Sequence, residues 1–566
     1  MQISVHFLKA ALLGAFCVLG GPLAGRDAVA QPTVTIADGT VVGIVRDNTE
    51  SFAGIPFAQP PVGPLRLKPP QRLNSSFGTL DASSPGPACP QQVVDTSSAD
   101  LLSQVLGYLV DTPLFMSALN QSEDCLFATV QRPAGTTAED NLPVVVWIFG
   151  GGFEVGWSSM YDGIGLVQRG IDLNQPFVYV AIAYRVGGFG FMPGSEILED
   201  GSSNLGLLDQ RLALEWVADN IGAFGGDPDK VTLWGESAGA MSIFDQMALY
   251  DGDHTYNDKP LFHGAIMNSG SIVPAAPVDA TKGNEVYSQV VQAAGCSEAS
   301  SSLDCLRSLD YADFLDAANS VPNILSYQSI ALSYLPRPDG KVLTQSPELL
   351  LQAGKYAAVP VIIGDQEDEG TLFSIFQSNL STVDDIIDYL HDYAFIDASR
   401  EEVAGFINTY DSSSSAGSPY NTGPFNEIYP YFKLMASAIG DIVFTLTRRV
   451  FLSAFATAHP DVAAWSYLSS YDYGTPILGS FHGGDILQVF YGILPNYASA
   501  ATQTYFINFI TNGDPNIGTT DYPLWPQWSE ARQLMQFWSI TSDFITDDFR
   551  SPSYEYILNN GTNLRL

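Results

Sequence analysis

The chain has little positive charge for its length. Its 566 residues include 24 Lys and Arg against 61 Asp and Glu, so the formal net charge at pH 7 is −37. A surface this acidic repels nucleic acid phosphates and anionic membranes, which argues against nucleic acid as a partner. The acidity favours solubility in an acidic or extracellular medium, and repulsion of anionic products is the weaker alternative. Hydrophobic residues make up 46% of the chain and charged residues 15%, which is typical of a globular protein.

Long hydrophobic runs are also scarce. The apolar stretch 10–21 follows Lys9 and is too short to span a bilayer, and Ala28-Val29-Ala30 resembles a cleavage site for signal peptidase. We therefore interpret residues 1–30 as a signal peptide. No later segment offers about 20 apolar residues in a row, so we expect a secreted, extracellular and soluble mature protein.

Cysteine is rare, and its count is informative. Removal of the signal peptide takes Cys17 away and leaves an even set of four: Cys89, Cys125, Cys296 and Cys305. In a secreted chain this set indicates two disulfides, and three pairings are possible. We favour the sequence-local pairs Cys89–Cys125 and Cys296–Cys305, since the spacing is too irregular for a zinc site. The sequons headed by Asn74, Asn120, Asn379 and Asn560 are predicted glycosylation sites.

The fold class follows from short apolar segments of strand length. A hairpin is predicted around Asp38-Gly39, between 33–36 and 40–45. Helical patterns such as 205–224 separate several of the later segments. Apolar strands that alternate with helices predict an α/β protein with a large, mostly parallel sheet covered on both faces. Its ligand site should lie beyond the carboxyl ends of the strands. The predicted strands of this sheet are 143–149, 177–183, 231–234, 265–267, 359–363 and 463–468.

A candidate nucleophile follows one of these strands. The segment Gly235-Glu236-Ser237-Ala238-Gly239 lies between strand 231–234 and a predicted helix. A strand, a G-x-S-x-G turn and a helix together expose the serine hydroxyl on a sharp elbow, which points to nucleophilic attack by Ser237. The alternative is an ordinary strand-to-helix turn.

An oxyanion needs fixed N–H donors, and two places supply them. One is the N–H of Ala238, by the geometry of the elbow. The other is the glycine run Gly150-Gly151-Gly152, which ends strand 143–149. A phosphate loop is the competing interpretation of this run. No G-K-[ST] follows, and Phe153-Glu154 puts an acid nearby, so we reject a phosphate site.

Histidine is scarce enough to find the base by elimination. Chains with this elbow follow the order serine, acid, histidine, which leaves His391, His459 and His482. The first two lie in or at the end of predicted helices. His482 lies in a loop of small residues beyond the last predicted strand, as a mobile base requires. Four carboxylates compete for the role of the acid, and composition does not choose among them: Asp365, Glu367, Asp368 and Glu369.

Several motifs together resemble the type-B carboxylesterase/lipase family. They are Phe224-Gly225-Gly226 with Val231 to Gly239, Glu123-Asp124-Cys125-Leu126, the segment 52–66, and Asn204 to Gln210. Residues 147–156 and 364–371 are similar to the fungal lipases and sterol esterases of the Candida rugosa lipase group. The resemblance covers nearly the whole mature chain. It implies an α/β-hydrolase fold with a single catalytic domain, 31–566, and no cofactor or metal.

The resemblance also implies roles for individual residues. It makes Glu369 the acid beside Ser237 and His482, and Gly151, Gly152 and Ala238 the oxyanion donors. It supports the sequence-local disulfides. It implies a lid at about 90–124, where the apolar face of a helix over 99–109 would otherwise be read as core. The positions of Met241, Leu372, Phe373 and Ile486 match acyl-pocket residues of that group, and core packing is the alternative.

The sequence therefore predicts a secreted serine ester hydrolase for esters of apolar acyl chains: a lipase, sterol esterase or broad carboxylesterase. A feruloyl-type esterase acting on phenolic esters is the alternative enzyme. A non-catalytic binding protein with the same fold is disfavoured, because such proteins typically lose a member of the triad and all three are present here. We expect a small-molecule or lipid ester as substrate, at most transient contact with lipid through the lid, and a monomer or homodimer.

Overall fold

The computed structural model describes residues 31–92, 118, 120–490, 495–518 and 521–566. The predicted signal peptide, 1–30, lies outside the described residues. So does the predicted lid helix over 99–109.

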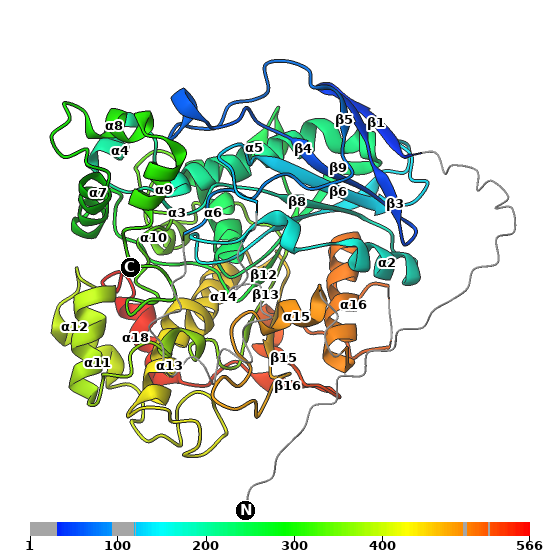
Figure 1. Ribbon diagram of the computed structural model, residues 1–566. Helices are drawn as coiled ribbons and strands as arrows, with labels where there is room; N and C mark the ends of the chain where they lie inside the picture. Colours follow the sequence, from blue (N-terminus) through cyan, green and yellow to red (C-terminus); the bar gives the residue numbers. More distant parts are fainter. Residues whose placement is uncertain (1–30, 93–117, 119, 491–494, 519–520) are drawn as a thin grey trace, which may run out of the picture.

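A twisted sheet of 11 strands forms the centre of the molecule (Figure 1). Seven neighbouring strands, from β8 to β15, run parallel, and antiparallel strands complete both edges. All six strands predicted for the sheet belong to the parallel part. In spatial order the strands are β16 (Ser542–Thr546), β15 (Gln533–Phe537), β14 (Ala464–Ser469), β13 (Val361–Gln366), β12 (Gly264–Asn268), β9 (Gly226–Glu236), β7 (Leu142–Ile148), β8 (Val178–Ile182), β6 (Phe127–Pro133), β4 (Thr49–Pro56) and β3 (Ile44–Arg46).

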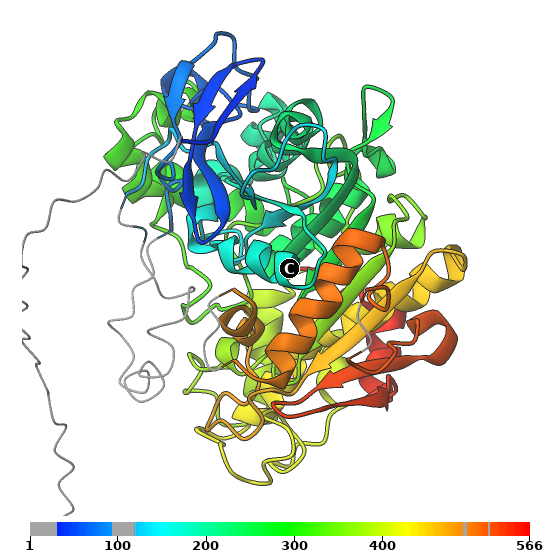
Figure 2. The same ribbon diagram turned by 90° about the vertical axis from the view of Figure 1, so that its right-hand side faces the viewer.

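Helices cover both faces of this sheet (Figures 1 and 2). On one face α6 (Ala238–Gly252) packs against β9 and β12, with α5 (Leu205–Asn220) against α6. On the other, α16 (Tyr497–Asn512) and α2 (Ile164–Asp172) pack against each other and the sheet. Strands β8, β12 and β14 are buried along their whole length, because both of their faces meet helices. The predicted doubly covered sheet is confirmed.

The remaining helices lie around this core. They are α3 (Gly187–Gly190), α4 (Ser195–Asp200), α7 (Thr281–Ala293), α8 (Ser302–Ser308), α9 (Tyr311–Ala318), α10 (Pro347–Gln352), α11 (Val383–Tyr389), α12 (Arg400–Ile407), α13 (Phe432–Gly440), α14 (Leu446–Ala458), α15 (Gly484–Val489), α17 (Trp528–Ala531) and α18 (Ser551–Asn560). The predicted hairpin is confirmed: β1 (Thr33–Ile36) pairs antiparallel with β2 (Gly39–Val42), and β5 (Gly78–Asp81) completes a small separate sheet. A further short pair joins β10 (Thr255–Tyr256) and β11 (Lys259–Pro260).

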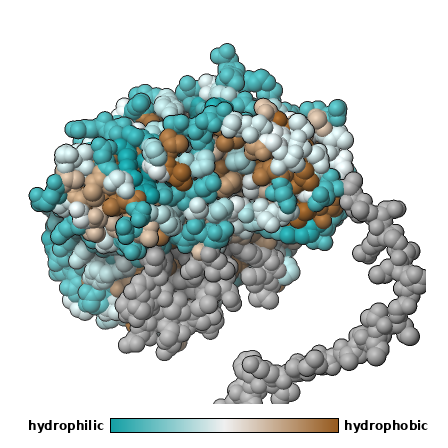
Figure 3. All heavy atoms as spheres, turned by 45° about the horizontal axis from the view of Figure 1, so that its top comes forward, coloured by the Kyte–Doolittle hydropathy of each residue, from teal (hydrophilic) through white to brown (hydrophobic). Residues whose placement is uncertain are grey.

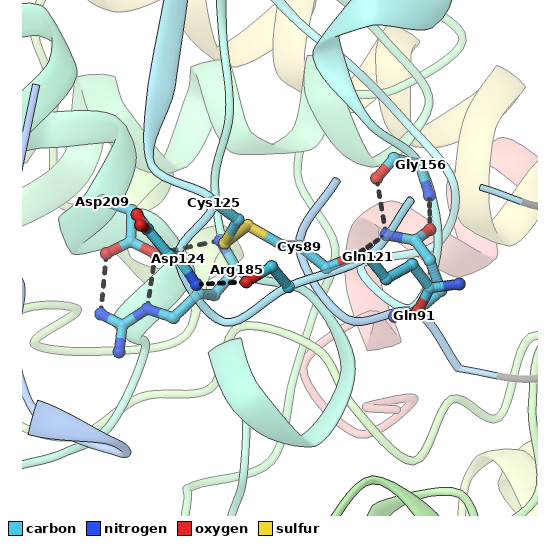
Figure 4. The surroundings of a disulfide bond; sticks show 9 residues. Cys89, Gln91, Gln121, Asp124, Cys125, Gly156, Arg185 and Asp209 are labelled. Carbon is cyan, nitrogen blue, oxygen red and sulfur yellow. Dashed lines mark hydrogen bonds and ion pairs between the residues drawn. A yellow bond between two sulfur atoms is a disulfide. The ribbon is translucent and has the colours of Figure 1, made fainter. Parts of the chain in front are cut away.

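The predicted sequence-local disulfides are confirmed: Cys89 pairs with Cys125, and Cys296 pairs with Cys305. Figure 4 shows the first pair beside the side chain of Gln91. The amide of Gln91 donates to Gly156 O at 3.0 Å and accepts from Gly156 N at 2.6 Å. The disulfide and the two hydrogen bonds of Gln91 therefore hold residues 89–92 beside Gly156, which follows the glycine run 150–152.

The face of the molecule drawn in Figure 3 is largely polar. Figure 3 shows one face on which hydrophilic residues predominate and hydrophobic areas are small and separated. Asn74, Asn120 and Asn379 are exposed, whereas Asn560 is half-buried in α18 and donates to Tyr556 O at 3.0 Å. Within the described ranges, no helix is long and apolar enough to cross a membrane.

Candidate active site

Ser237 stands on a sharp turn between β9 and α6. Its backbone has φ 56° and ψ −126°, a conformation that costs energy for any residue with a Cβ. A Cβ on Gly239 would lie 2.1 Å from Ile148 O, and one on Gly235 would lie 2.6 Å from the carbonyl carbon of Gly239. The turn therefore admits only glycine at these two positions. It places the Ser237 hydroxyl at the first turn of α6.

His482 and Glu369 complete a hydrogen-bonded line from Ser237. Ser237 Oγ lies 2.8 Å from His482 Nε2, and His482 Nδ1 lies 2.5 Å from Glu369 Oε2. Glu369 Oε1 accepts from the backbone N–H of Gln366 at 2.7 Å, so both of its carboxylate oxygens are held. All three side chains of this line are at least 95% buried. The two other candidate histidines lie elsewhere: His391 is beside Asp392, and His459 packs on Tyr356.

The four competing carboxylates have four different neighbours. Asp365 lies 2.7 Å from Nε of the buried Arg448. Glu367 accepts from Asn421 Nδ2 at 3.1 Å, and Asp368 binds backbone and hydroxyl donors of two loops. Glu369 alone among these four accepts from a histidine.

Two further buried carboxylates surround the imidazole, and sequence reasoning missed both. Glu236 Oε1 lies 3.4 Å from His482 Nε2. Asp485 accepts from Asn268 Nδ2 at 2.7 Å. Both could have been found from the sequence by their proximity to triad residues, since Glu236 directly precedes Ser237 and Asp485 follows His482 by three positions.

These carboxylates alter the titration of the site. Burial opposes a charge on His482, but Glu369, Glu236 and Asp485 outweigh this effect and raise the pKa of His482 above its ordinary value. Burial raises the pKa of Glu236 to about 8 and the pKa of Asp485 to about 6. The surroundings therefore favour an imidazolium cation at this position.

The glycine run closes over the serine. Gly151 has φ 110° and Gly152 has φ 62°, which favour glycine. A Cβ on Gly150 would lie 2.8 Å from the Cβ of Ser237, and one on Gly152 would lie 2.5 Å from Ile324 Cδ1. Only backbone without side chains fits this close to Ser237. Ala238 is the first residue of α6, whose amino-terminal N–H groups favour negative charge.

An apolar pocket lies beside Ser237 and His482. Phe373 packs against His482 with a centroid distance of 5.0 Å, and Phe444 does so at 4.5 Å. Two of the four predicted pocket residues, Met241 and Phe373, line this pocket. The described residues that line it are Gly152, Phe153, Ser237, Ala238, Met241, Val273, Ile324, Ile330, Leu332, Leu335, Phe373, Val443, Phe444 and Leu566.

The other two predicted pocket residues lie elsewhere. Leu372 belongs to a separate small cluster with Ile375, Leu478 and Phe481. Ile486 lies in α15 and packs in the same main core as Met241 and Phe373, but it is not among the residues that line the pocket. Adjacency in sequence to a motif did not fix the direction of these side chains. The lining residues between 273 and 335 belong to none of the motifs found in the sequence.

Comparison with known proteins places this geometry in a family. The model of the carboxylesterase family matches residues 30–556. A secreted triacylglycerol lipase of Gibberella zeae is 56% identical over 94% of this chain and 91% of its own, and lipase 2 of Diutina rugosa is 44% identical over 95% and 97%. The crystal structure of EstA from Aspergillus niger superposes with a TM-score of 0.80 at 26% identity, over 95% of this chain and 99% of EstA. The chain therefore belongs to the carboxylesterase family, has the α/β-hydrolase fold, and is a secreted carboxylic ester hydrolase.

Proposed function

We propose that the enzyme hydrolyses esters of apolar acyl chains, triacylglycerols among them, through an acyl-enzyme on Ser237. The observation that carries this proposal is the buried line from Glu369 through His482 to Ser237, at 2.5 and 2.8 Å, beside an apolar pocket. Its relative in Gibberella zeae carries the name of a triacylglycerol lipase, which adds support for this substrate class.

In the proposed mechanism, His482 Nε2 takes the proton of Ser237 Oγ as this oxygen attacks the ester carbonyl. The N–H groups of Gly151, Gly152 and Ala238 stabilise the oxyanion of the tetrahedral intermediate. His482 then gives the proton to the leaving alcohol oxygen, and the acyl group stays on Ser237. His482 then takes a proton from a water molecule as this water attacks the acyl carbonyl. The bond between the acyl carbon and Ser237 Oγ breaks, His482 returns the proton to Ser237 Oγ, and the carboxylic acid leaves.

Glu369 has an orienting role in this mechanism. Its Oε2 holds the Nδ1–H of His482, so that Nε2 faces Ser237 without a proton, and its charge stabilises the imidazolium. Glu236 and Asp485 add to this stabilisation, since both favour the charged imidazole.

The pocket favours aliphatic acyl chains over phenolic acids. Among the described residues that line it, Ser237 alone has a polar side chain. The hydroxyl of a feruloyl group would lie there without a hydrogen-bond partner, which costs about 1–3 kcal/mol. An alkyl chain has no such cost and gains from burial. The apolar pocket therefore argues against the feruloyl-type alternative, while sterol esters and simple alkyl esters stay within the proposal.

We also retain a lid as part of the proposal. The segment 90–124 would cover the entrance to the site of a single catalytic domain, 31–566, and meet lipid with its apolar face. What supports this is the base of the segment: Cys89–Cys125 joins its ends, and Gln91 is fixed to Gly156.

A substrate panel tests the proposal. We expect kcat/KM for p-nitrophenyl butyrate, p-nitrophenyl palmitate and emulsified triolein to exceed that for p-nitrophenyl acetate and methyl ferulate by about tenfold or more. The rate on cholesteryl oleate in the same panel shows whether the enzyme accepts a sterol as the alcohol part of the ester. If methyl ferulate had the highest kcat/KM in the panel, the proposed preference for apolar acyl chains would be wrong.

Ser237→Ala provides the test of the nucleophile in the same panel. We expect a loss of about 10³-fold or more in kcat on every ester, because no other group carries the acyl intermediate. Ser242→Ala is the matched control, since Ser242 also lies buried in α6 but accepts from Gln210 instead. Full activity of Ser237→Ala would contradict the mechanism.

A further inference from the structure

Asp368 is a buried carboxylate next to Glu369 that does not touch the imidazole. It is 2% exposed. Its Oδ1 accepts from Ser418 Oγ and from the N–H of Tyr420, both at 2.8 Å. Its Oδ2 accepts from the N–H of Ser480 at 3.0 Å. One carboxylate thus joins two loops that are 60 residues apart in sequence, and one of them carries His482.

The contact with the histidine loop is close along its length. The backbone N–H of Asp368 donates to Ser480 O at 2.9 Å. Thr371 Oγ donates to Leu478 O at 2.8 Å. A Cβ on Gly479, whose φ is 60°, would lie 2.1 Å from Asp368 Oδ2, so the loop rests directly on the carboxylate. The segment 478–481 is therefore held to the turn after β13 by side-chain and backbone bonds.

The loop that contains Ser418 and Tyr420 is bonded to helix α13. The N–H of Ser418 lies 3.2 Å from Lys433 O and 3.0 Å from Ser437 Oγ, which both belong to α13. A Cβ on Gly370 would lie 1.9 Å from Ala436 O, so the turn that carries Glu369 packs on the same helix. Asp368 thus ties the histidine loop to a helix that also supports the acid.

We propose that Asp368 is a positioning residue, which fixes the loop 478–481 and thereby sets the distance from His482 Nε2 to Ser237 Oγ. The inference rests on the proposed function, in which His482 is the base. A displacement of about 1 Å at a reacting group lowers the rate by as much as about 100-fold, so a loop that carries the base needs such a support.

The chemistry at Asp368 requires a carboxylate. Tyr420 N–H and Ser480 N–H are donors only, and they approach opposite oxygens. An amide in this place would turn its NH₂ group toward one of these N–H groups and lose a buried hydrogen bond. The carboxylates that most raise the pKa of His482 are Glu369, Glu236 and Asp485. Loss of the charge on Asp368 should therefore move the imidazole without changing its titration.

Asp368→Asn tests this role with p-nitrophenyl butyrate, in protein whose folding is verified by its thermal transition. We expect kcat to fall by about 10- to 100-fold, with KM within about threefold of the parent. The midpoint of the acid limb of kcat/KM against pH should stay in place. Glu367→Gln is the matched control on the same turn, because its carboxylate accepts from Asn421 and not from the histidine loop; its kcat should stay within about twofold.

Three results would overturn the inference: a folded Asp368→Asn with the kcat of the parent, an equal loss of kcat in Glu367→Gln, or a shifted acid limb with an unchanged plateau. If Asp368→Asn does not fold, Ser418→Ala removes one donor to Asp368 and keeps its charge. We then expect kcat to fall by about two- to fivefold, and an unchanged kcat counts against the inference.

Ser237→Ala in the same assay separates the two proposals. If Ser237→Ala keeps full activity, the proposed mechanism fails, whatever Asp368→Asn does. If Ser237→Ala is inactive and Asp368→Asn behaves as the parent, only the positioning role fails.

Discussion

The two sides of Ser237 are built in different ways. On the polar side, side chains that follow β9, β13 and β14 meet through hydrogen bonds of fixed length, such as Glu369 Oε2 to His482 Nδ1 at 2.5 Å. On the apolar side, the wall combines Ile324, Leu332 and Phe444, which come from distant parts of the chain and meet by packing. Hydrogen bonds fix the direction of a proton transfer, whereas packing fixes only shape. We infer that the polar side carries the reaction and the apolar side selects the ester, so mutations should separate them.

The largest effect is expected on the polar side. In Glu369→Gln an amide replaces the carboxylate that holds His482 Nδ1–H, so the imidazolium loses its counter-charge and the tautomer is no longer fixed. We expect kcat to fall by about 10³- to 10⁴-fold, by a similar factor on acetate, butyrate and palmitate esters. Steady-state kinetics with the three p-nitrophenyl esters measure this. A loss that grows with acyl length would show that the two sides are not separable.

A smaller, selective effect is expected on the apolar side. Leu332→Ala removes part of the pocket wall. We expect this loss to weaken the binding of a long acyl chain more than that of the two-carbon acetyl group. The ratio of kcat/KM for palmitate to that for acetate should fall by about 5- to 30-fold.

Leu372→Ala is the control for this prediction. It is the same substitution in a buried leucine directly before Phe373 in the chain, but Leu372 packs in the separate cluster with Leu478. The palmitate-to-acetate ratio should stay within about twofold. If Leu372→Ala changed this ratio more than Leu332→Ala, the assignment of the pocket wall would be wrong.

The smallest effect concerns pH. Asp485 raises the pKa of His482, and the unprotonated imidazole is the active base, so activity is lost as pH falls through that pKa. Asp485→Asn should lower the pKa of His482 and move the acid limb of kcat/KM to lower pH. Asp251→Asn, at an exposed pair with Lys355, should leave the limb in place. Movement of the limb to higher pH in Asp485→Asn would contradict the electrostatic account.

The polar side was largely predictable from the sequence because its signals are local. The elbow around Ser237 needs glycine at two fixed positions, and the scarcity of histidine left three candidates for the base. The acid was not decided by the residues alone, because Asp365, Glu367, Asp368 and Glu369 lie within five positions and only their distant neighbours distinguish them. The family resemblance pointed to Glu369, and the structure places this residue beside His482.

The apolar side was much less predictable, because pocket walls are made by tertiary contacts. Ile324 and Leu332 lie far from any motif. Leu372 and Ile486 follow motifs directly, but neither lines the pocket, and Leu372 packs in a separate cluster. The same limit applies to the fold. The parallel strands were found as apolar runs, whereas the antiparallel strand β6, which pairs with β4 and β8, contains Gln131 and Arg132, and this polar pair interrupts its apolar pattern.

The most direct test of the central claim is the site of covalent labelling by a fluorophosphonate, mapped by mass spectrometry of the digested protein. An activated serine beside its base should react, and the account predicts one adduct, on the peptide that contains Ser237, with loss of ester hydrolysis in proportion to labelling. An unlabelled Ser237, or full loss of activity with the adduct on another residue, would contradict it.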